Sequence, residues 1–326
     1  MRRRRFAVAA AALLCAAALP AAWAQAFPAK PLRLVVPFPP GGPTDLFARL
    51  YGQRLATVLG QQVVVENKAG ASGAIGSMEV MRAAPDGYTL LFGTASTHSL
   101  YNLMNPAPQY DALKDFAPVA IVGGAAVVFI AHPALPGTLR EVLAQAKANP
   151  GKLRYGSPGS GTLMHIAAER LKREAGGLDI QHIPYKGTAQ SKPALLGGQI
   201  ELMTDTLGSS LAEHKAGKMR ILAIAAPKRS PQAPEVPTVD EALGSRGFQA
   251  VLWNVVLAPA GTPAAVLETL SAATGKVVAD AAVQESLAKF AIEVETGSGP
   301  QAATAYMRAE MSRWKPIIDA AGIKAE

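Results

Sequence analysis

The stretch VVPFPPGGPTD, residues 35–45, decides how the first part of this chain folds. Two β-branched residues lead into a turn rich in proline and glycine, and LFARLYGQRLATVLG then follows with its apolar residues at helical spacing. One interpretation is simple helix capping by Thr44 or Asp45. The other is that the glycines let the backbone approach a ligand, and that N–H groups at the helix start attract a carboxylate or phosphate. This stretch alone leaves both interpretations open.

Two further strand ends carry hydroxyl-rich loops. SPGSGT (157–162) precedes a predicted helix, and GTASTHS (93–99) spans a strand end that leads into the predicted polar loop ASTHS (95–99). In open α/β sheets, ligands bind beyond the carboxyl ends of strands, where all three loops lie. Thr162 is equally suited to be an N-cap. Taken together, three loops rich in hydroxyls and poor in charge favour a small oxyanion ligand. Asp45 is then mainly a cap, because a carboxylate repels an anion.

Short β-prone runs alternate with amphipathic segments along the whole chain. Strands are predicted at 32–38, 62–67, 88–94, 118–136, 152–157, 179–185, within 196–206, and at 219–226 and 251–263. Helices are predicted at 44–59, 74–84, 139–148 and 163–174, and the last sixty residues are expected to be mostly helical. This alternation predicts two α/β units of similar organisation, as in two lobes that hold a ligand between them.

Composition limits the classes of function. With 326 residues, 49% of them hydrophobic and 17% charged, the chain is long enough for two cores. The net charge of +8 includes four arginines at positions 2–5, and without them 28 basic residues face 24 acidic ones. No basic stripe with interleaved aromatic residues is present, so nucleic acid is not predicted as a partner.

The N-terminus, MRRRRFAVAAAALLCAAALPAAWAQA, has the pattern of a secretory signal peptide. A basic segment precedes a short apolar run that ends at Pro20, which fits a membrane anchor less well. Cleavage is predicted after Ala24, so residues 1–24 are the signal peptide and the mature protein is periplasmic. The only cysteine, Cys15, is lost with it, which predicts a mature chain without disulfides.

Motifs for catalysis or cofactors are not found. The five histidines lack metal-ligand spacing, and neither a phosphate-binding loop nor a GxSxG elbow occurs. We therefore predict no metal, no cofactor and no enzyme activity. A serine hydrolase using Ser157 or Ser160, with His165 as base about one helical turn away, is the weaker alternative. The roles of two charged residues stay open. Lys186 either steers an anion or is a solvated surface residue, and Asp205 either accepts a hydrogen bond from a ligand amine or hydroxyl or caps the next segment.

Several stretches resemble the Bug family, the periplasmic substrate-binding receptors of tripartite tricarboxylate transporters. They are PLRLVVPFPPGGPTDLFARL (31–50), VVVENKAGASGAIG (63–76), PDGYTLLFGTASTHS (85–99), LRYGSPGSGTLMHIAAE (153–169), IPYKGTAQSKPALLGGQIELMTD (183–205) and GKMRILAIA (217–225). The resemblance covers essentially the whole mature chain, in order. It implies an α/β, two-lobed Venus-flytrap fold in which each lobe is a mixed sheet flanked by helices. Lobe 1 would combine residues 25–124 and 255–326, and lobe 2 would be residues 125–254.

The resemblance also implies a ligand carboxylate held between the lobes by backbone amides, hydroxyls and waters. Matched to this sequence, the implied ligand-binding residues are Phe38, Gly41, Gly42, Thr44, Thr94, Ser96, His98, Ser157, Gly159, Ser160, Gly161, Thr162, Tyr185, Lys186 and Asp205. The implied partners are a small carboxylate and the membrane subunits of a tripartite tricarboxylate transporter, with the receptor as a monomer.

The identity of the ligand stays open at this point. With few charged donors, a small dicarboxylate or an aromatic monocarboxylate is favoured, while amino acids and uncharged amides remain possible. A ligand-sensing adaptor for a membrane sensor kinase is the main alternative function.

Overall fold

The computed structural model describes residues 27–323, so the predicted signal peptide and its cleavage site lie outside the described residues. The strands are β1 (Leu32–Val36), β2 (Val63–Asn67), β3 (Thr89–Thr94), β4 (Phe116–Ala131), β5 (Arg154–Ser157), β6 (Gln181–Pro184), β7 (Leu202–Thr206), β8 (Arg220–Ile224), β9 (Val251–Pro259) and β10 (Ile292–Val294). The helices are α2 (Pro43–Leu59), η1 (Ala71–Gly73), α3 (Ala74–Met81), η2 (Ser96–Leu100), α4 (Tyr101–Met104), α5 (Leu139–Ala148), α6 (Leu163–Glu174), α7 (Thr188–Leu196), α8 (Leu207–Lys215), α9 (Val239–Leu243), α10 (Ala264–Ala279), α11 (Ala281–Ala288) and α12 (Pro300–Ala321).

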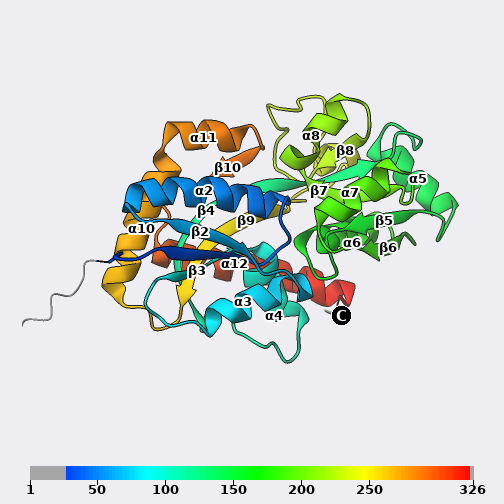
Figure 1. The fold of residues 1–326 in the computed structure, drawn as a ribbon. Coiled ribbons are helices and arrows are strands. Elements are labelled where there is room, and N and C mark those ends of the chain that lie inside the picture. Colours follow the sequence, from blue (N-terminus) through cyan, green and yellow to red (C-terminus); the bar gives the residue numbers. More distant parts are fainter. Residues whose placement is uncertain (1–26, 324–326) are drawn as a thin grey trace, which may run out of the picture.

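Two lobes lie side by side, and the long strand β4 runs through both (Figure 1). The strands follow the order β2-β1-β3-β9-β4-β7-β5-β6, with β10 and β8 also paired to β4. The first part of β4 pairs with β9 and β10, whereas from Val127 onward it pairs with β7 and β8. The parallel pairs, β1 with β2 and β3 and β5 with β6 and β7, lie toward the outer ends of this strand order. The strands next to β4 and β9 pair with them in the antiparallel sense. The predicted α/β periplasmic binding protein fold with mixed sheets is confirmed.

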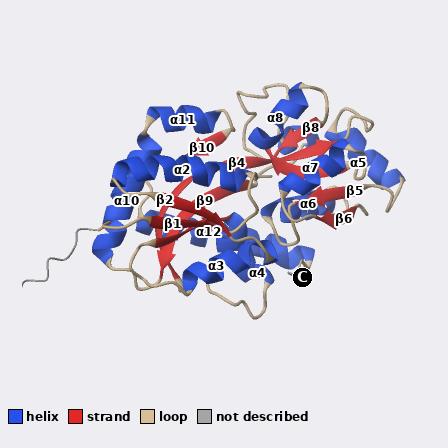
Figure 2. Cartoon of the chain, in the orientation of Figure 1, coloured by secondary structure: helices blue, strands red, loops and turns tan. Residues whose placement is uncertain are grey.

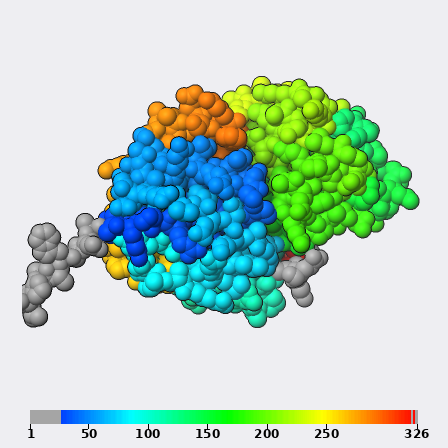
Figure 3. All heavy atoms as spheres, viewed as in Figure 1, coloured from blue at the N-terminus to red at the C-terminus, as the bar shows by residue number. Residues whose placement is uncertain are grey.

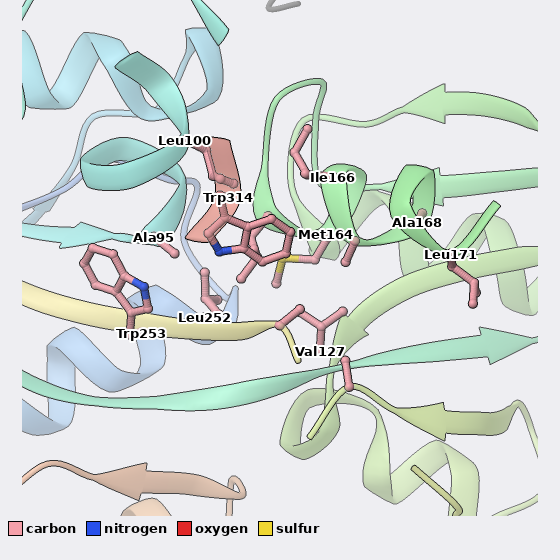
Figure 4. Packing of buried hydrophobic residues seen from close by; sticks show 14 of the residues in the cluster. Ala95, Leu100, Val127, Met164, Ile166, Ala168, Leu171, Leu252, Trp253 and Trp314 are labelled. Atoms are coloured by element: carbon pink, nitrogen blue, oxygen red, sulfur yellow. The ribbon is translucent and has the colours of Figure 1, made fainter. Parts of the chain in front are cut away.

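Helices cover both faces of the left-hand sheet in Figure 2. One apolar cluster packs α2, α10 and α11 on one face, and includes Phe47, Phe92 and Val277. A second cluster lies on the other face and continues into the second lobe, because Trp314 of α12 and Met164 of α6 both belong to it. Figure 4 shows Trp314, Met164, Leu252 and Val127 close together where the lobes join. Apolar burial therefore links the lobes as well as stabilising each one.

The predicted polar loop at 95–99 is wrong. Residues 96–100 form a single π-helical turn, η2, that leads directly into α4. The hydroxyl of Thr97 accepts from the Thr94 amide at 3.0 Å and donates to the Thr94 carbonyl at 3.2 Å. All five residues of η2 are buried. Local hydrogen bonding and burial thus turn a stretch of loop-like composition into helix.

Candidate functional site

A cavity lies between the two lobes. It is lined from the first lobe by Phe38, Pro39, Pro40, Gly42, Pro43, Thr44 and Ser96, from the second lobe by Pro158, Thr162, Met164, Gly187, Thr188 and Ala189, and by Leu252 of β9. No lining residue within the described part of the chain carries a charge. A ligand in this cavity would contact both lobes, as closure around a bound solute requires.

The first-lobe wall is the turn that ends β1. Gly41 has a φ of +82°, a conformation that glycine adopts without strain. The N-cap of α2 is Gly42, and Pro43 follows at the first helical position, so neither Thr44 nor Asp45 is the cap. Asp45 instead accepts the Gly41 amide at 2.9 Å and ties the turn to the helix. The Asp45 carboxylate in α2 therefore fixes the turn that precedes the helix, and the neighbouring Thr44 lines the cavity.

Asp45 does not place a bare negative charge beside the cavity. Burial alone would raise its pKa, but hydrogen bonds from Arg49, the Gly41 amide and Asn67 together lower it. The Arg49 guanidinium lies 3.0 Å from the carboxylate, and the Asn67 amide donates at 2.9 Å. The Arg49 guanidinium thus balances the charge of this carboxylate.

The second-lobe wall consists of the turns before α6 and α7. Thr162 is the N-cap of α6, as the sequence suggested, and its hydroxyl accepts the His165 amide at 3.4 Å. Gly187, with a φ of +105°, caps α7, and Thr188 and Ala189 form the first turn of that helix. The first-turn amides of a helix have no acceptor within the helix. First-turn residues of α2, α6 and α7 all line the cavity, so three positive helix ends face one space.

The turn SPGSGT rests on two stacked imidazoles. The rings of His165 and His182 lie 4.1 Å apart at an interplanar angle of 9°. His182 Nε2 shares a 2.7 Å hydrogen bond with the Ser157 hydroxyl, and His165 Nδ1 accepts the Gly161 amide at 3.0 Å. Burial, helped by the nearby His165 and Lys172, lowers the pKa of His182 to about 3. The neutral His182 ring and the His165 ring stacked on it thus hold the turn in place.

The lobes touch at the mouth of the cavity. The Leu163 amide of α6 donates to the Ser96 hydroxyl at 3.0 Å, and the Ser72 hydroxyl donates to the Ser160 carbonyl. On the other side of the cavity, Gly208 of α8 lies against the backbone of Phe290. In the space-filling view the two lobes meet along a closed seam (Figure 3). The molecule is therefore in a closed arrangement.

Five of the predicted site residues line the cavity: Phe38, Gly42, Thr44, Ser96 and Thr162. Gly41, Gly159, Ser160 and Gly161 belong to the adjoining turns, and Ser157 is buried beneath its own turn. Tyr185 packs against the core of the second lobe. The remaining lining residues were not predicted, namely Pro39, Pro40, Pro43, Pro158, Met164, Gly187, Thr188, Ala189 and Leu252. The sequence did contain a signal for residues 187–189, because Gly187 and Thr188 form the same glycine–threonine pair at a helix start as Gly161 and Thr162.

Three predicted residues lie behind the cavity wall. Thr94 and His98 are fully buried in the first lobe, and neither Thr94 Oγ1 nor His98 Nε2 has a hydrogen-bond partner among residues 27–323. Asp205 is fully buried at the end of β7, and burial raises its pKa. Its carboxylate accepts from the Thr206 amide and from the hydroxyls of Ser209 and Ser210. Asp205 thus organises the start of α8.

Lys186 is exposed beside the cavity, and its backbone amide donates to the Gln190 side chain at 3.2 Å. Groups of three or more potential metal-ligating residues are not found between residues 27 and 323. No helix in the same range is both long and apolar enough to cross a bilayer.

We expect His98 to make the protein less stable in acid. Burial lowers the pKa of His98 to about 3, whereas the imidazole in the unfolded chain protonates near pH 6.5. Between these values only the unfolded state binds the proton, so the free energy of unfolding falls as the pH falls. From about pH 7 to about pH 5 this residue should account for about 2 kcal/mol. Urea unfolding at both pH values should show a pH dependence smaller by that amount in His98→Gln. An unchanged pH dependence in the variant would contradict this assignment.

Comparisons with known proteins agree with the fold. The family model described as the tripartite tricarboxylate transporter family receptor matches residues 47–323. The periplasmic binding protein BugD is 34% identical, with a TM-score of 0.87 over 92% of this chain and 100% of BugD. MatC from Rhodopseudomonas palustris, solved with bound malate, is 32% identical, with a TM-score of 0.85 over 90% of this chain and 100% of MatC. R. palustris Rpa4515, solved with adipate, is 32% identical, with a TM-score of 0.87 over 91% of this chain and 99% of Rpa4515. The chain therefore belongs to the receptor family of the tripartite tricarboxylate transporters, which includes the Bug periplasmic binding proteins.

Proposed function

We propose that this protein is a periplasmic receptor that binds a small carboxylate between its lobes and presents it to the membrane subunits of a tripartite tricarboxylate transporter. One observation carries the proposal: three helix N-termini, from both lobes, face a single cavity without charged side chains. Main-chain N–H groups at helix starts hold carboxylates well, and hydroxyls add further donors. Malate and adipate in MatC and Rpa4515 support a carboxylate ligand here.

The proposed contacts come from the first turns of the three helices. In this proposal the backbone N–H groups of Thr44 and Met164 donate hydrogen bonds to the ligand carboxylate. Those of Thr188 and Ala189, in the first turn of α7, do the same from the second lobe. The Ser96 hydroxyl, which accepts the Leu163 amide, adds a further donor, whereas the Thr162 hydroxyl already donates to the Gly159 carbonyl at 2.7 Å. The apolar remainder, including Phe38 and Leu252, excludes water and strengthens these hydrogen bonds.

The proposed lobes are residues 25–124 with 255–326, and residues 125–254. The partners of β4 change between Ala126 and Val127, which supports the first boundary. From Asn254 onward β9 also pairs with β3 of the first lobe, which supports the second. Two strands, β4 and β9, would then act as the hinge for closure.

We also propose that residues 1–24 direct export, that they are removed by cleavage after Ala24, and that the mature receptor acts as a monomer. A hydrolase role for Ser157 is disfavoured, because its hydroxyl is buried, bonded to His182 and absent from the cavity lining. A substrate in the cavity would not reach that oxygen.

The test is a thermal-shift and calorimetric panel on the mature protein after unfolding and refolding to remove bound ligand. The panel holds malate, adipate, other di- and tricarboxylates, aromatic acids, amino acids and amides. A ligand at 100 times its dissociation constant should stabilise the protein by about 2.7 kcal/mol, a shift of a few degrees. A panel in which no carboxylate shifts the transition would overturn the proposal.

A cavity-filling variant shows where the ligand binds. Ala189 is exposed at the start of α7 and lines the cavity, so Ala189→Trp should fill the space and abolish the shift. The unliganded transition should stay close to that of the wild type. Ala281→Trp, on an exposed position of α11, is the matched control and should bind normally. Normal binding by Ala189→Trp would place the ligand elsewhere.

A further inference from the structure

The turn between β2 and α3 has an unusual backbone conformation. Four consecutive residues have a positive φ, namely Gly70 at +135°, Ala71 at +44°, Ser72 at +52° and Gly73 at +97°. Glycine adopts such angles without strain, whereas alanine and serine are disfavoured in the left-handed region by their Cβ atoms. Strained residues persist only where the surrounding structure holds them, and they are concentrated at functional sites. Residues 70–73 are therefore a candidate functional element.

The first lobe fixes this turn beside the cavity. The Gly73 amide donates to the Gly70 carbonyl at 3.0 Å, and the Ser77 hydroxyl donates to the Gly73 carbonyl at 2.9 Å. A Cβ atom on Gly73 would lie 2.5 Å from the Thr97 side chain and 3.2 Å from the ring of Phe38, so the turn packs closely on both. Because Phe38 lines the cavity, the turn lies directly behind part of the cavity wall.

Ser72 connects this turn to the second lobe. Its hydroxyl donates to the Ser160 carbonyl in the turn before α6. A Cβ atom built on Gly159 would lie 3.7 Å from Ser72 Oγ, and one built on Gly161 would lie 3.9 Å from it. The hydroxyl therefore packs against the glycines of that turn as well as bonding to it. The next residue of the same turn, Thr162, lines the cavity.

A second serine of the first lobe bonds to the following residues of the second lobe. The Ser96 hydroxyl accepts the Leu163 amide at 3.0 Å. One hydroxyl thus satisfies a carbonyl and the other satisfies an amide, which the donor and acceptor capacity of serine allows. Both bonds join the two lobes, so they form when the lobes close. Ser96 also lines the cavity, whereas Ser72 does not, so Ser72 can be replaced without removing a group from the cavity wall.

We propose that Ser72 is a positioning residue that holds the ligand-binding turn of the second lobe in the closed form, and so lengthens the time for which a bound carboxylate is retained. The inference rests on the proposed function. A bond that is present only in the closed form stabilises that form, so it slows ligand dissociation and leaves association little changed. The strained backbone of residues 70–73 is what directs the hydroxyl at the second lobe.

The experiment is stopped-flow measurement of malate and adipate exchange. Cys15, the only cysteine, lies in the predicted signal peptide, so two fluorophores can be attached to the mature protein through Ala281→Cys in α11 and Lys147→Cys in α5. Both positions are exposed, and the pair reports the distance between the lobes. In Ser72→Ala and in Ser72→Gly, dissociation should become roughly three- to tenfold faster, as expected for the loss of one hydrogen bond, with association within about twofold. Unchanged dissociation in both variants would refute the inference.

Two controls test whether the hydroxyl is responsible. Ala71→Gly relieves strain beside Ser72 but keeps the hydroxyl, so ligand should leave no faster than from the wild type. Ser286→Ala is the matched control, because this partly buried serine donates to the Ala282 carbonyl at 2.7 Å within α11 and should exchange ligand normally. If either control accelerates dissociation as much as Ser72→Ala does, the assignment to the Ser72 hydroxyl is wrong.

The unliganded protein separates this inference from the proposed function. The same fluorophore pair should report a longer mean distance between the lobes in Ser72→Ala than in the wild type, because the closed form has lost a bond. Normal exchange of a bound carboxylate by both Ser72 variants would refute the role of Ser72 and leave the proposed function intact. If the wild type binds no carboxylate, the proposed function fails, and equal distances in the wild type and Ser72→Ala would then refute the role of Ser72 as well.

Discussion

Replacement of Gly208 by alanine is expected to weaken ligand binding by roughly ten- to a hundredfold, about 1.4 to 2.8 kcal/mol. Gly208 lies in the first turn of α8, and a methyl group there would overlap the carbonyl of Phe290 and lie 2.6 Å from its Cα. Phe290 belongs to the other lobe, so the clash exists only when the lobes are closed. The open form tolerates the methyl group, and the unliganded protein should keep its stability. Calorimetry with the carboxylate found in the panel measures the change.

Gly275 provides the control for this experiment. It lies inside α10, where an added methyl group would contact nothing within 4 Å. Gly275→Ala should therefore bind as the wild type does, and helix propensity should make it slightly more stable. Small-angle scattering adds a readout that needs no affinity, because Gly208→Ala with ligand should remain more expanded than the wild type. Equal affinity and equal compactness would show that this contact is not part of the bound form.

Replacement of Glu310 by alanine is expected to cost about 3 to 5 kcal/mol of unfolding free energy. Its buried carboxylate accepts both indole N–H groups, from Trp253 at 3.0 Å and from Trp314 at 3.3 Å. It also receives two bonds of 2.8 Å from Arg313. Without it, two indoles and a guanidinium lose their acceptor between β9 and α12. Urea unfolding of the unliganded protein at neutral pH measures the loss.

Two further variants separate charge from hydrogen bonding. Glu310→Gln keeps one acceptor oxygen and should lose less than Glu310→Ala. Glu285→Ala removes a carboxylate whose side chain is 75% exposed and paired with Lys289, and should cost no more than about 1 kcal/mol. If Glu310→Ala costs as little as Glu285→Ala, the buried cluster does not stabilise the fold as described.

Much of the cavity could be predicted, because its parts are local in sequence. The turn 35–45 and the turn 157–162 each follow a strand and begin a helix, and such turns present amides wherever they occur. Thr162 was predicted as a cap from its position alone, and α6 was predicted with its observed bounds. The role of Asp45 was harder to predict, since one of its partners, Asn67, comes from another element, β2. A capping residue and a residue that braces a turn look alike in sequence.

The sequence by itself determined the strand and helix pattern, the two α/β units and the lack of charge in the binding turns, because these follow from local composition and spacing. Only the tertiary structure decided which of those turns share a cavity. It placed Thr188 and Thr44 in the walls of one cavity, and it buried Thr94 and His98 inside the first lobe. The physical reason is that these contacts join residues far apart in the chain, whose meeting depends on the path of β4 and β9 through both lobes.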